Sequence, residues 1–216
     1  MTIGVLSSLA GSVVPAVLAR FAEAYPQVEV SIADGYTSTF IDWVNVGALD
    51  LAIINKPPRK TGLVSHPLLD EEMVVVGARD TPLPVSVPIS MRDLAQVELI
   101  LPSHRHGLRV ELDRHLAAED VAVAPRLELD SLPSIAELVA RTRWFTVLPR
   151  LAVGRELVDG SLKAYRIIKP QIARQLVVVH NPTQPMSVAA AKLIEILAEE
   201  LGEIVRQLQK HIIVAD

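Results

Sequence analysis

The sequence predicts an α/β fold organised as two lobes. Short apolar runs typical of buried strands alternate with segments of helical periodicity, which favours mostly parallel sheets covered by helices. This alternation occurs in two similar runs, each of three strands with their helices. The chain of 216 residues is long enough for two small lobes that each bury a core.

The first run opens with a strand and a helix that meet at a joint of small polar residues. Ile3 to Leu6 are apolar without interruption, and apolar residues recur at helical spacing from Val14 to Phe21. We expect Thr37 or Ser38 to cap the next helix. The further elements of this run are a half-buried strand over 26–35, a helix over 37–47, a strand over 50–55, an extended segment over 63–78 and a proline-rich loop over 79–88.

The second run repeats the pattern. Ser90 and Asp93 have nearly the spacing of a capping box, and Pro133 lies in the first turn of a helix entered through Asp130 or Ser131. Strands are predicted at 98–102, 124–130, 144–149, 162–167 and 174–180, and helices at 90–95, 107–120, 131–141, 149–157 and 187–208. The last helix has an apolar face through Leu193, Ile194, Leu197, Leu201, Ile204 and Leu208.

The order of the elements predicts where the chain passes between lobes. We expect lobe I to comprise residues 1–72 and 173–216, and lobe II to comprise residues 73–172. The first passage falls near Glu72 and the return falls within 169–175. Two crossings would form a hinge and leave a ligand cleft between the lobes.

Composition excludes several classes of protein. The chain has no cysteine, which excludes disulfides and thiolate metal sites and favours the cytoplasm. No signal-peptide pattern and no membrane-spanning apolar window is visible. The formal net charge is −4 and Lys and Arg residues do not cluster, so this chain alone is a poor candidate for binding DNA.

Motifs of catalysis and cofactor binding are absent from the sequence. It contains no glycine-rich dinucleotide or P-loop motif and no G-x-S-x-G elbow. Ser103, His104 and His106 lie close together, but no acid is placed nearby in sequence to orient either histidine. The two histidines could also bind a metal, although a polar loop before a helix is the favoured interpretation. We therefore expect no cofactor, no metal and no catalytic residues.

Small polar residues recur at four strand–helix joints. In an open α/β sheet these joints lie at the carboxyl ends of the strands, where ligands bind. A hydroxyl at such a joint either caps the helix or helps the helix N-terminus to bind an anion, and both alternatives stay open for each joint. The four joints contain Ser7 and Ser8; Thr37, Ser38 and Thr39; Ser103 and Gly107; and Asp130 and Ser131.

With these residues in place, the chain resembles the effector-binding domain of LysR-type transcriptional regulators. The resemblance covers nearly the whole chain. The segments that carry it are IGVLSSLAGSVVPAVLARFAEAYPQVEV, DLAII, HPLLDEEMVVVG, LILPSHRHGLR, LELDSLPSIAELV, FTVLPRLAV and DGSLKAYRIIKPQIARQLVVV. It implies a fold like that of the type II periplasmic binding proteins, with two Rossmann-like lobes, two crossover segments and an effector in the cleft between them.

The resemblance also implies a set of effector-binding residues, with the serines of the first joint both capping a helix and lining the pocket. By position in the family's motifs, these residues are Ser7, Ser8, Thr37, Ser38, Thr39, Ser103, His104, Gly107 and Thr146. The family usually has glycines where this chain has RTRWF, residues 141–145. Arg143 and Trp144 either shape the cleft, with Arg143 offering a guanidinium to a carboxylate, or point outward.

The implied function is that of a sensor in a bacterial transcription factor. A small, anionic metabolite would bind between the lobes and modulate transcription. The partners would be this effector and a second copy of the chain, contacted through 187–208 and 13–21, with a tetramer in the full-length protein. DNA would be bound only by a winged helix-turn-helix preceding Thr2, and no membrane is involved. The alternatives are a solute-binding protein of a transporter and a small enzyme that uses Ser103 and His104.

Overall fold

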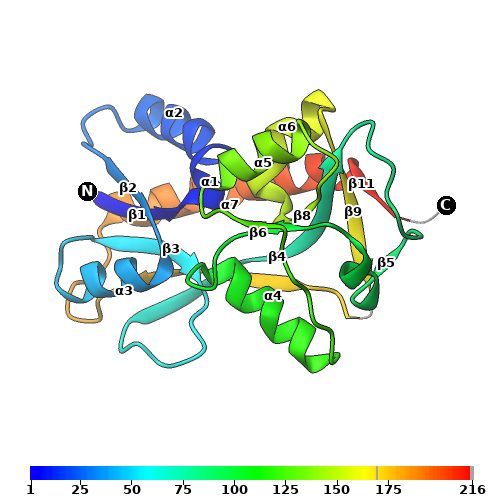
Figure 1. The fold of residues 1–216 in the computed structure, drawn as a ribbon. Helices are drawn as coiled ribbons and strands as arrows, with labels where there is room; N and C mark the ends of the chain where they lie inside the picture. Colours follow the sequence, from blue (N-terminus) through cyan, green and yellow to red (C-terminus); the bar gives the residue numbers. More distant parts are fainter. Residues whose placement is uncertain (169, 215–216) are drawn as a thin grey trace. The chain divides into compact units, whose positions relative to one another are not determined.

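The computed structural model describes residues 1–168 and 170–214 (Figure 1). The chain forms two compact units. Unit 1 comprises Met1–Asp70 and Gln175–Val205, and unit 2 comprises Glu71–Arg174 and Arg206–Asp216. The expected return segment 169–175 includes Lys169, which lies outside the described residues. Residues 206–216 group with unit 2, although the sequence predicts them in lobe I, so the chain passes between the units three times.

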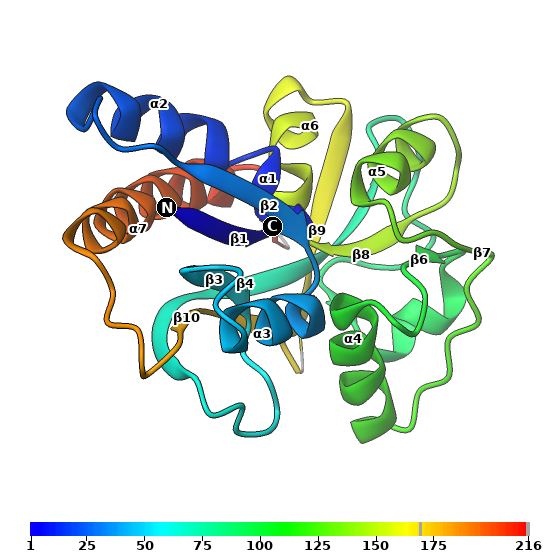
Figure 2. The same cartoon turned by 90° about the vertical axis from the view of Figure 1, so that its left-hand side faces the viewer.

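Unit 1 is a sheet with helices on both faces. Strand β1 pairs in parallel with β2 and β3, and β10 pairs antiparallel with β3. In Figure 2, α2 and α7 lie together on one side of these strands and α3 lies on the other. Arg20 of α2 pairs with Glu199 and Glu200 of α7, which joins the two helices. The elements are β1 (Thr2–Leu6), α1 (Ser7–Ala10), α2 (Val14–Ala24), β2 (Ser31–Gly35), α3 (Thr37–Asn45), β3 (Leu51–Asn55), the first part of β4 (Val64–Ala78), most of β10 (Ala173–His180) and most of α7 (Val188–Gln209).

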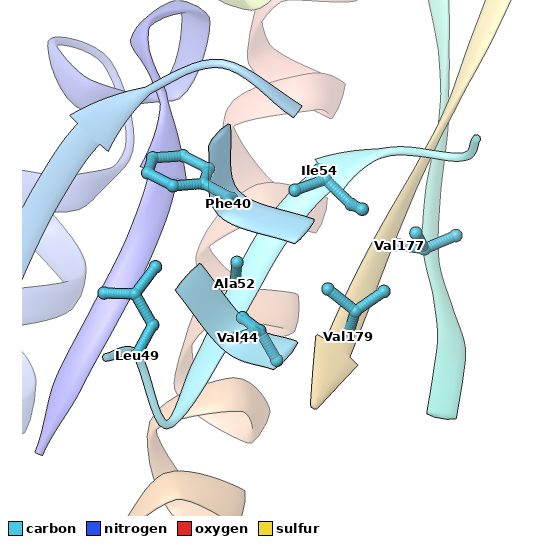
Figure 3. Packing of buried hydrophobic residues seen from close by; sticks show 7 residues of the cluster. All are labelled: Phe40, Val44, Leu49, Ala52, Ile54, Val177 and Val179. Carbon is cyan, nitrogen blue, oxygen red and sulfur yellow. The ribbon is translucent and has the colours of Figure 1, made fainter. Parts of the chain in front are cut away.

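The core of unit 1 is centred on Phe40, which α3 directs onto the sheet (Figure 3). The Phe40 side chain is fully buried, and Gly4 and Gly35 leave room for its ring. A Cβ on Gly35 would lie 3.2 Å from the ring. The remaining buried members of the cluster are Val44, Leu49, Ala52, Ile54, Val177 and Val179.

Unit 2 is built around the second part of β4. This strand pairs antiparallel with β8 and β9, and β9 in turn pairs in parallel with β5 and β11. A separate parallel pair joins β6 to β7. The elements are β5 (Ile89–Ser90), η1 (Arg92–Gln96), β6 (Ile100–Leu101), α4 (Gly107–Ala118), β7 (Leu127–Glu128), α5 (Leu132–Ala140), β8 (Thr146–Pro149), η2 (Arg150–Val153), α6 (Gly154–Asp159), β9 (Leu162–Ile168) and β11 (Ile212–Ile213).

Strand direction is where the predicted sheets differ from the structure. The sequence predicts mostly parallel sheets, but β4 runs antiparallel to β8 and β9, and β10 runs antiparallel to β3. Each of these antiparallel ladders involves β4 or β10, the strands that pass between the units. Hydrophobic periodicity reports which residues are buried and carries no information on strand direction.

Most of the predicted elements are present, with shifted ends. The expected strand over 26–35 begins only at Ser31, and the strands at 98–102 and 124–130 are reduced to two residues each. The predicted short helix at 90–95 is a 3₁₀ helix. Asp93 accepts from the Ser90 backbone N–H at 2.7 Å and its own N–H donates to Ser90 Oγ at 3.4 Å, so the two expected reciprocal bonds are present, although the N-cap of this helix is Met91.

Ionic and polar pairs join β4 to β10 at the place where both strands pass between the units. On the unit 1 side, Gln175 Nε2 donates to Asp70 Oδ1 at 2.9 Å. On the unit 2 side, Arg174 donates through Nε and Nη2 to Glu71 Oε2 at 2.8 and 2.6 Å. Glu71 and Arg174 are both buried, and the Leu151 backbone N–H donates to Glu71 Oε1 at 2.9 Å.

Gly4→Ala should destabilise the protein. A Cβ at this position would lie 2.8 Å from Leu49 Cδ1 and 2.9 Å from the Phe40 ring, so both buried side chains must move. Overpacking of this kind costs about 1–3 kcal/mol, and urea denaturation measures it. Gly11→Ala is the matched control, because nothing lies within 4 Å of its Cβ position. Equal stabilities of the two variants would contradict the role of Gly4.

Candidate functional site

The first candidate joint lies where β1 and β2 of unit 1 end side by side. Leu6 pairs with Gly35, so the residues that follow each strand emerge at one edge of the sheet. Ser7 Oγ donates to Asp34 Oδ1 at 2.6 Å. The N-cap of α1 is Leu6, and no side chain caps the helix. The prediction that Ser7 and Ser8 cap a helix is therefore wrong, and Ser7 instead anchors a carboxylate.

The second joint connects β2 to α3 at the same edge of unit 1. Its N-cap is Tyr36, which makes no side-chain cap bond to the helix, so the expectation that Thr37 or Ser38 caps α3 is wrong. Thr37 Oγ1 accepts from the Asn55 backbone N–H at 3.3 Å, which ties the start of α3 to the end of β3. Ser38 is exposed and Thr39 is half-buried. The first turn of α3 thus has no side-chain cap, and a polar ligand could bind its N–H groups.

The third joint, in unit 2, is also closed by a carboxylate. The Ser103 backbone N–H and hydroxyl donate to Asp130 at 2.8 and 3.1 Å. The backbone bond from Ser103, followed by its hydroxyl, lowers the pKa of Asp130. Ser103 therefore donates to an aspartate and not to a histidine, which leaves no hydroxyl–imidazole pair of a hydrolase at this joint.

His106 caps α4. It is the N-cap residue, its Nδ1 accepts from the Leu108 backbone N–H at 3.2 Å, and Gly107 is the first residue of the helix. His106 is buried, and burial lowers its pKa. A neutral imidazole is needed here, because an Nδ1 that accepts a hydrogen bond carries no proton.

His104 belongs to a different network from His106. Its Nδ1 lies 3.0 Å from Asp113 Oδ2, and its Nε2 lies 3.3 Å from Arg109 Nη2. Arg109 is buried and also bonds Asp113 Oδ1 at 2.8 Å and Glu128 Oε1 at 3.0 Å. The sequence shows no acid beside His104 to orient it, and in the structure Asp113 of α4 does so from nine positions further along the chain.

The remaining candidate residues of unit 2 do not share one environment. Thr146 is fully buried in β8, and its hydroxyl has no hydrogen-bond partner within the described part of the chain. The Arg143 side chain is 80% exposed and pairs with Glu98 at 3.3 Å. Trp144 is half-buried. For Arg143 this exposure favours the outward-pointing alternative.

Ser131 caps α5 as one of the two residues expected to do so. Its Oγ accepts from the Ser134 backbone N–H at 3.4 Å, and Pro133 lies in the first turn. Capping accounts for Ser131, whereas Asp130 of the same joint accepts from Ser103.

Asp34 and Asp113 are the polar residues that the sequence analysis missed. Asp34 lies near the end of the predicted strand 26–35, and alternation along the strand gives no signal for a bond to Ser7. Asp113 follows Arg109 at i+4 on a helix, a spacing that favours an ion pair. That spacing was the available signal for the His104 network.

Other sites in the described residues are limited. A cavity of ≈ 590 Å³ in unit 2 is lined by residues of 78–81, 140–142 and 159–161, none of which belongs to the predicted site. No group of three or more potential metal ligands occurs among the residues that the structure describes. Over the same residues, no helix is long and apolar enough to cross a membrane.

Comparison with known families identifies the class of protein. The family model described as LysR substrate binding domain matches residues 1–202. The chain therefore belongs to the LysR substrate-binding domain family, which confirms the family indicated by the sequence segments.

The similar curated proteins are named as regulators. BbuR of Bordetella bronchiseptica is 24% identical over 97% of this chain. YeiE of Escherichia coli is 25% identical over 88%, and a probable hydrogen peroxide-inducible genes activator of Streptomyces viridosporus is 29% identical over 99%. The chain spans 64% of the length of BbuR and of YeiE and 68% of the Streptomyces protein.

Solved structures share the fold. OxyR of Corynebacterium glutamicum superposes with a TM-score of 0.84 at 22% identity, over 97% of this chain and 66% of its own. The CcmR regulatory domain of Synechocystis, in complex with 2-PG, superposes at 0.81 with 25% identity, over 92% and 95%. These are LysR-type regulatory domains, so the α/β fold with two Rossmann-like lobes and the type II periplasmic-binding-protein architecture is confirmed.

Stability should depend on the neutral state of His106. Its pKa is lowered in the folded protein, so below about pH 6.5 the unfolded chain binds more protons than the folded chain and the free energy of unfolding falls. His106→Asn keeps an N-cap acceptor but cannot titrate. We expect urea denaturation of this variant to depend less on pH between about 7 and about 5. A pH dependence identical to that of the wild type would contradict this role, and exposed His211→Asn is the control.

Proposed function

We propose that this chain is the effector-sensing domain of a bacterial LysR-type transcription regulator. The observation that carries the proposal is the family match over residues 1–202. The similar curated proteins named above are transcriptional regulators or gene activators, which supports a regulatory role over transport. A regulator acts where the DNA is, so the cytoplasm is its proposed location.

The proposed effector site uses the polar edges of both units. Ser7, Ser8, Thr37, Ser38 and Thr39 belong to unit 1. The corresponding residues of unit 2 are Ser103, His104, Gly107 and Thr146, with Trp144 as a residue that shapes the site, whereas the exposed Arg143 points away from it. Carboxyl ends of parallel strands are where open α/β sheets bind ligands, which supports the unit 1 set in particular.

The charges at the joints constrain the effector. An anionic group is best accepted by the uncapped first turn of α3, in a helix of nine residues. The Asp34 and Asp130 carboxylates accept from Ser7 and Ser103, so each of these joints repels a second anion. We therefore infer an effector with one anionic end and hydrogen-bond donors elsewhere. The 2-PG bound by CcmR is a ligand of the corresponding domain in that protein.

The mechanism follows from the thermodynamics of linkage. The effector shifts the equilibrium between two arrangements of the protein only by the difference of its affinities for them. A DNA-binding domain outside this chain would transmit the shift to the operator. No catalytic residue is proposed, and the regulatory names of the relatives support a role without catalysis.

A homodimer is the proposed assembly, with a tetramer in the full-length regulator. Helices α2 and α7 adjoin each other in unit 1 and would form the interface by isologous contacts. DNA contacts are not assigned to this chain, because its formal net charge is −4 and its Lys and Arg residues do not cluster.

A thermal-stability screen tests the function and the site together. Central-metabolism acids, aromatic acids and amino acids are added to the domain, and a ligand at about 100 times its Kd should raise Tm by roughly 5–10 °C. Ser8→Ala, Thr37→Ala and Asp34→Asn should each lower the shift. Ser86→Ala, exposed in the loop of unit 2, is the control that should leave it unchanged.

The screen distinguishes a failure of the proposed site from a failure of the proposed function. A shift retained by all three variants would contradict the unit 1 site while leaving an effector in place. The inferred role of Asp34 would be contradicted if acids without hydrogen-bond donors raised Tm just as much and if Asp34→Asn left this rise in Tm unchanged.

The assembly is tested by sedimentation equilibrium of the isolated chain. We expect a dimer at micromolar concentrations. Arg20→Glu places like charges beside Glu199 and Glu200, so it should weaken any dimer that depends on the packing of α2 on α7. A chain that stays monomeric at high micromolar concentration contradicts the dimer.

A further inference from the structure

Two histidines meet on the neighbouring strands β4 and β10. His66 lies on β4 and His180 on β10, and these strands are hydrogen-bonded neighbours in the sheet. Their ring centroids are 5.6 Å apart and the ring planes differ by 6°. Both residues belong to unit 1, and neither is part of the proposed effector site.

The tautomer of His180 leaves one nitrogen free to bind a ligand. His180 Nδ1 lies 3.2 Å from the Asn181 backbone carbonyl, which can only accept, so Nδ1 carries the proton. The lone pair is then on Nε2. Metal-binding histidines characteristically donate their other N–H to a carbonyl or carboxylate in this way, because the bond orients the ring and raises its basicity.

His66 supplies the second nitrogen. It is exposed, and its only recorded contact among the described residues is with the His180 ring. Within 1–168 and 170–214, no other group holds either of its nitrogens, so its ring can turn about the side-chain torsions without breaking a hydrogen bond there. Half-buried His180 is the fixed ligand of the pair and His66 the adjustable one.

The ring separation allows one shared ion once the His66 ring turns. The two rings are stacked with planes 6° apart, so their in-plane lone pairs lie in nearly parallel planes and meet at one ion only after rotation of His66. With nitrogen–metal bonds of about 2.0–2.1 Å, two imidazoles on a tetrahedral ion have centroids roughly 5 Å apart, so the strands hold the two rings within reach of such an ion. We propose that His66 and His180 form a two-histidine site for a divalent transition-metal ion. Imidazole suits Zn²⁺, Ni²⁺ and Cu²⁺, and the remaining coordination positions would be filled by water.

The position of the site gives it a consequence for the fold. His66 precedes the passage of β4 into unit 2, and His180 follows the return of β10 from it. An ion bound by both imidazoles would cross-link the two strands on the unit 1 side of these passages. Metal binding would then stabilise the pairing of β4 with β10 by mass action.

Isothermal titration with NiCl₂ and with ZnCl₂, after removal of metals with EDTA, tests the site on the whole chain. We expect one ion per chain. His66→Gln and His180→Gln should each weaken binding more than about tenfold, since loss of an outer partner alone costs 10–100-fold in metal affinity. Circular dichroism and thermal melts without metal confirm that the variants fold.

Two other histidines provide the controls, because each has a carboxylate neighbour that could also hold an ion. His104 lies beside Asp113, and His115 lies 3.1 Å from Glu111. His104→Gln and His115→Gln should leave the titration unchanged. Loss of binding in either of these variants with retention in His66→Gln overturns the proposal, and so does a wild-type chain that binds neither ion.

Discussion

The ion pair between Glu71 and Arg174 joins the two strands through which the chain passes between its units. Burying two charges costs several kcal/mol per ion, and only close geometry with further hydrogen bonds offsets that cost. Both conditions are met, because Arg174 donates twice to one carboxylate oxygen and the Leu151 N–H donates to the other. Removing either partner would leave an uncompensated buried charge. This contact therefore stabilises the pairing of β4 with β10 beside Glu71 and Arg174.

The sequence predicted the elements well because periodicity records burial. Of the apolar face predicted for the last helix, α7 buries Leu193, Leu197, Leu201 and Leu208, whereas Ile194 and Ile204 are half-buried and the buried Ile196 was missed. The continuous run after Glu72 forms the buried half of β4. Strand direction could not be predicted, since β4 has the same pattern of burial whichever way its neighbours run. The two-residue strand β11 could not be predicted either, because its pairing with β9 depends on where α7 ends.

The candidate site was predictable as a set of positions, but the contacts within it were not. Ser7 and Ser103 stand at the expected joints, yet each hydroxyl donates to an aspartate 27 residues away in sequence. Such bonds are made by the sheet register, which brings β2 beside β1 and β7 beside β6. Local patterns favoured capping by the serines and threonines because capping is the common use of a hydroxyl before a helix. At α1 and α3 no side chain caps the first turn of the helix. The hydroxyl groups at these two joints are therefore available for other contacts.

The continuity of α7 has a mechanical consequence. This helix of 22 residues begins in unit 1 and ends in unit 2, so it is a third connection beside the two strands. A helix resists bending because each turn is braced by its hydrogen bonds, and it yields most easily where a residue favours the helix least. Gly202 is such a residue, one turn before Val205, and open space surrounds the position that its side chain would occupy. The packing around α7 does not require a glycine at this position. Gly202 therefore makes the helix easier to bend close to the boundary between the two units.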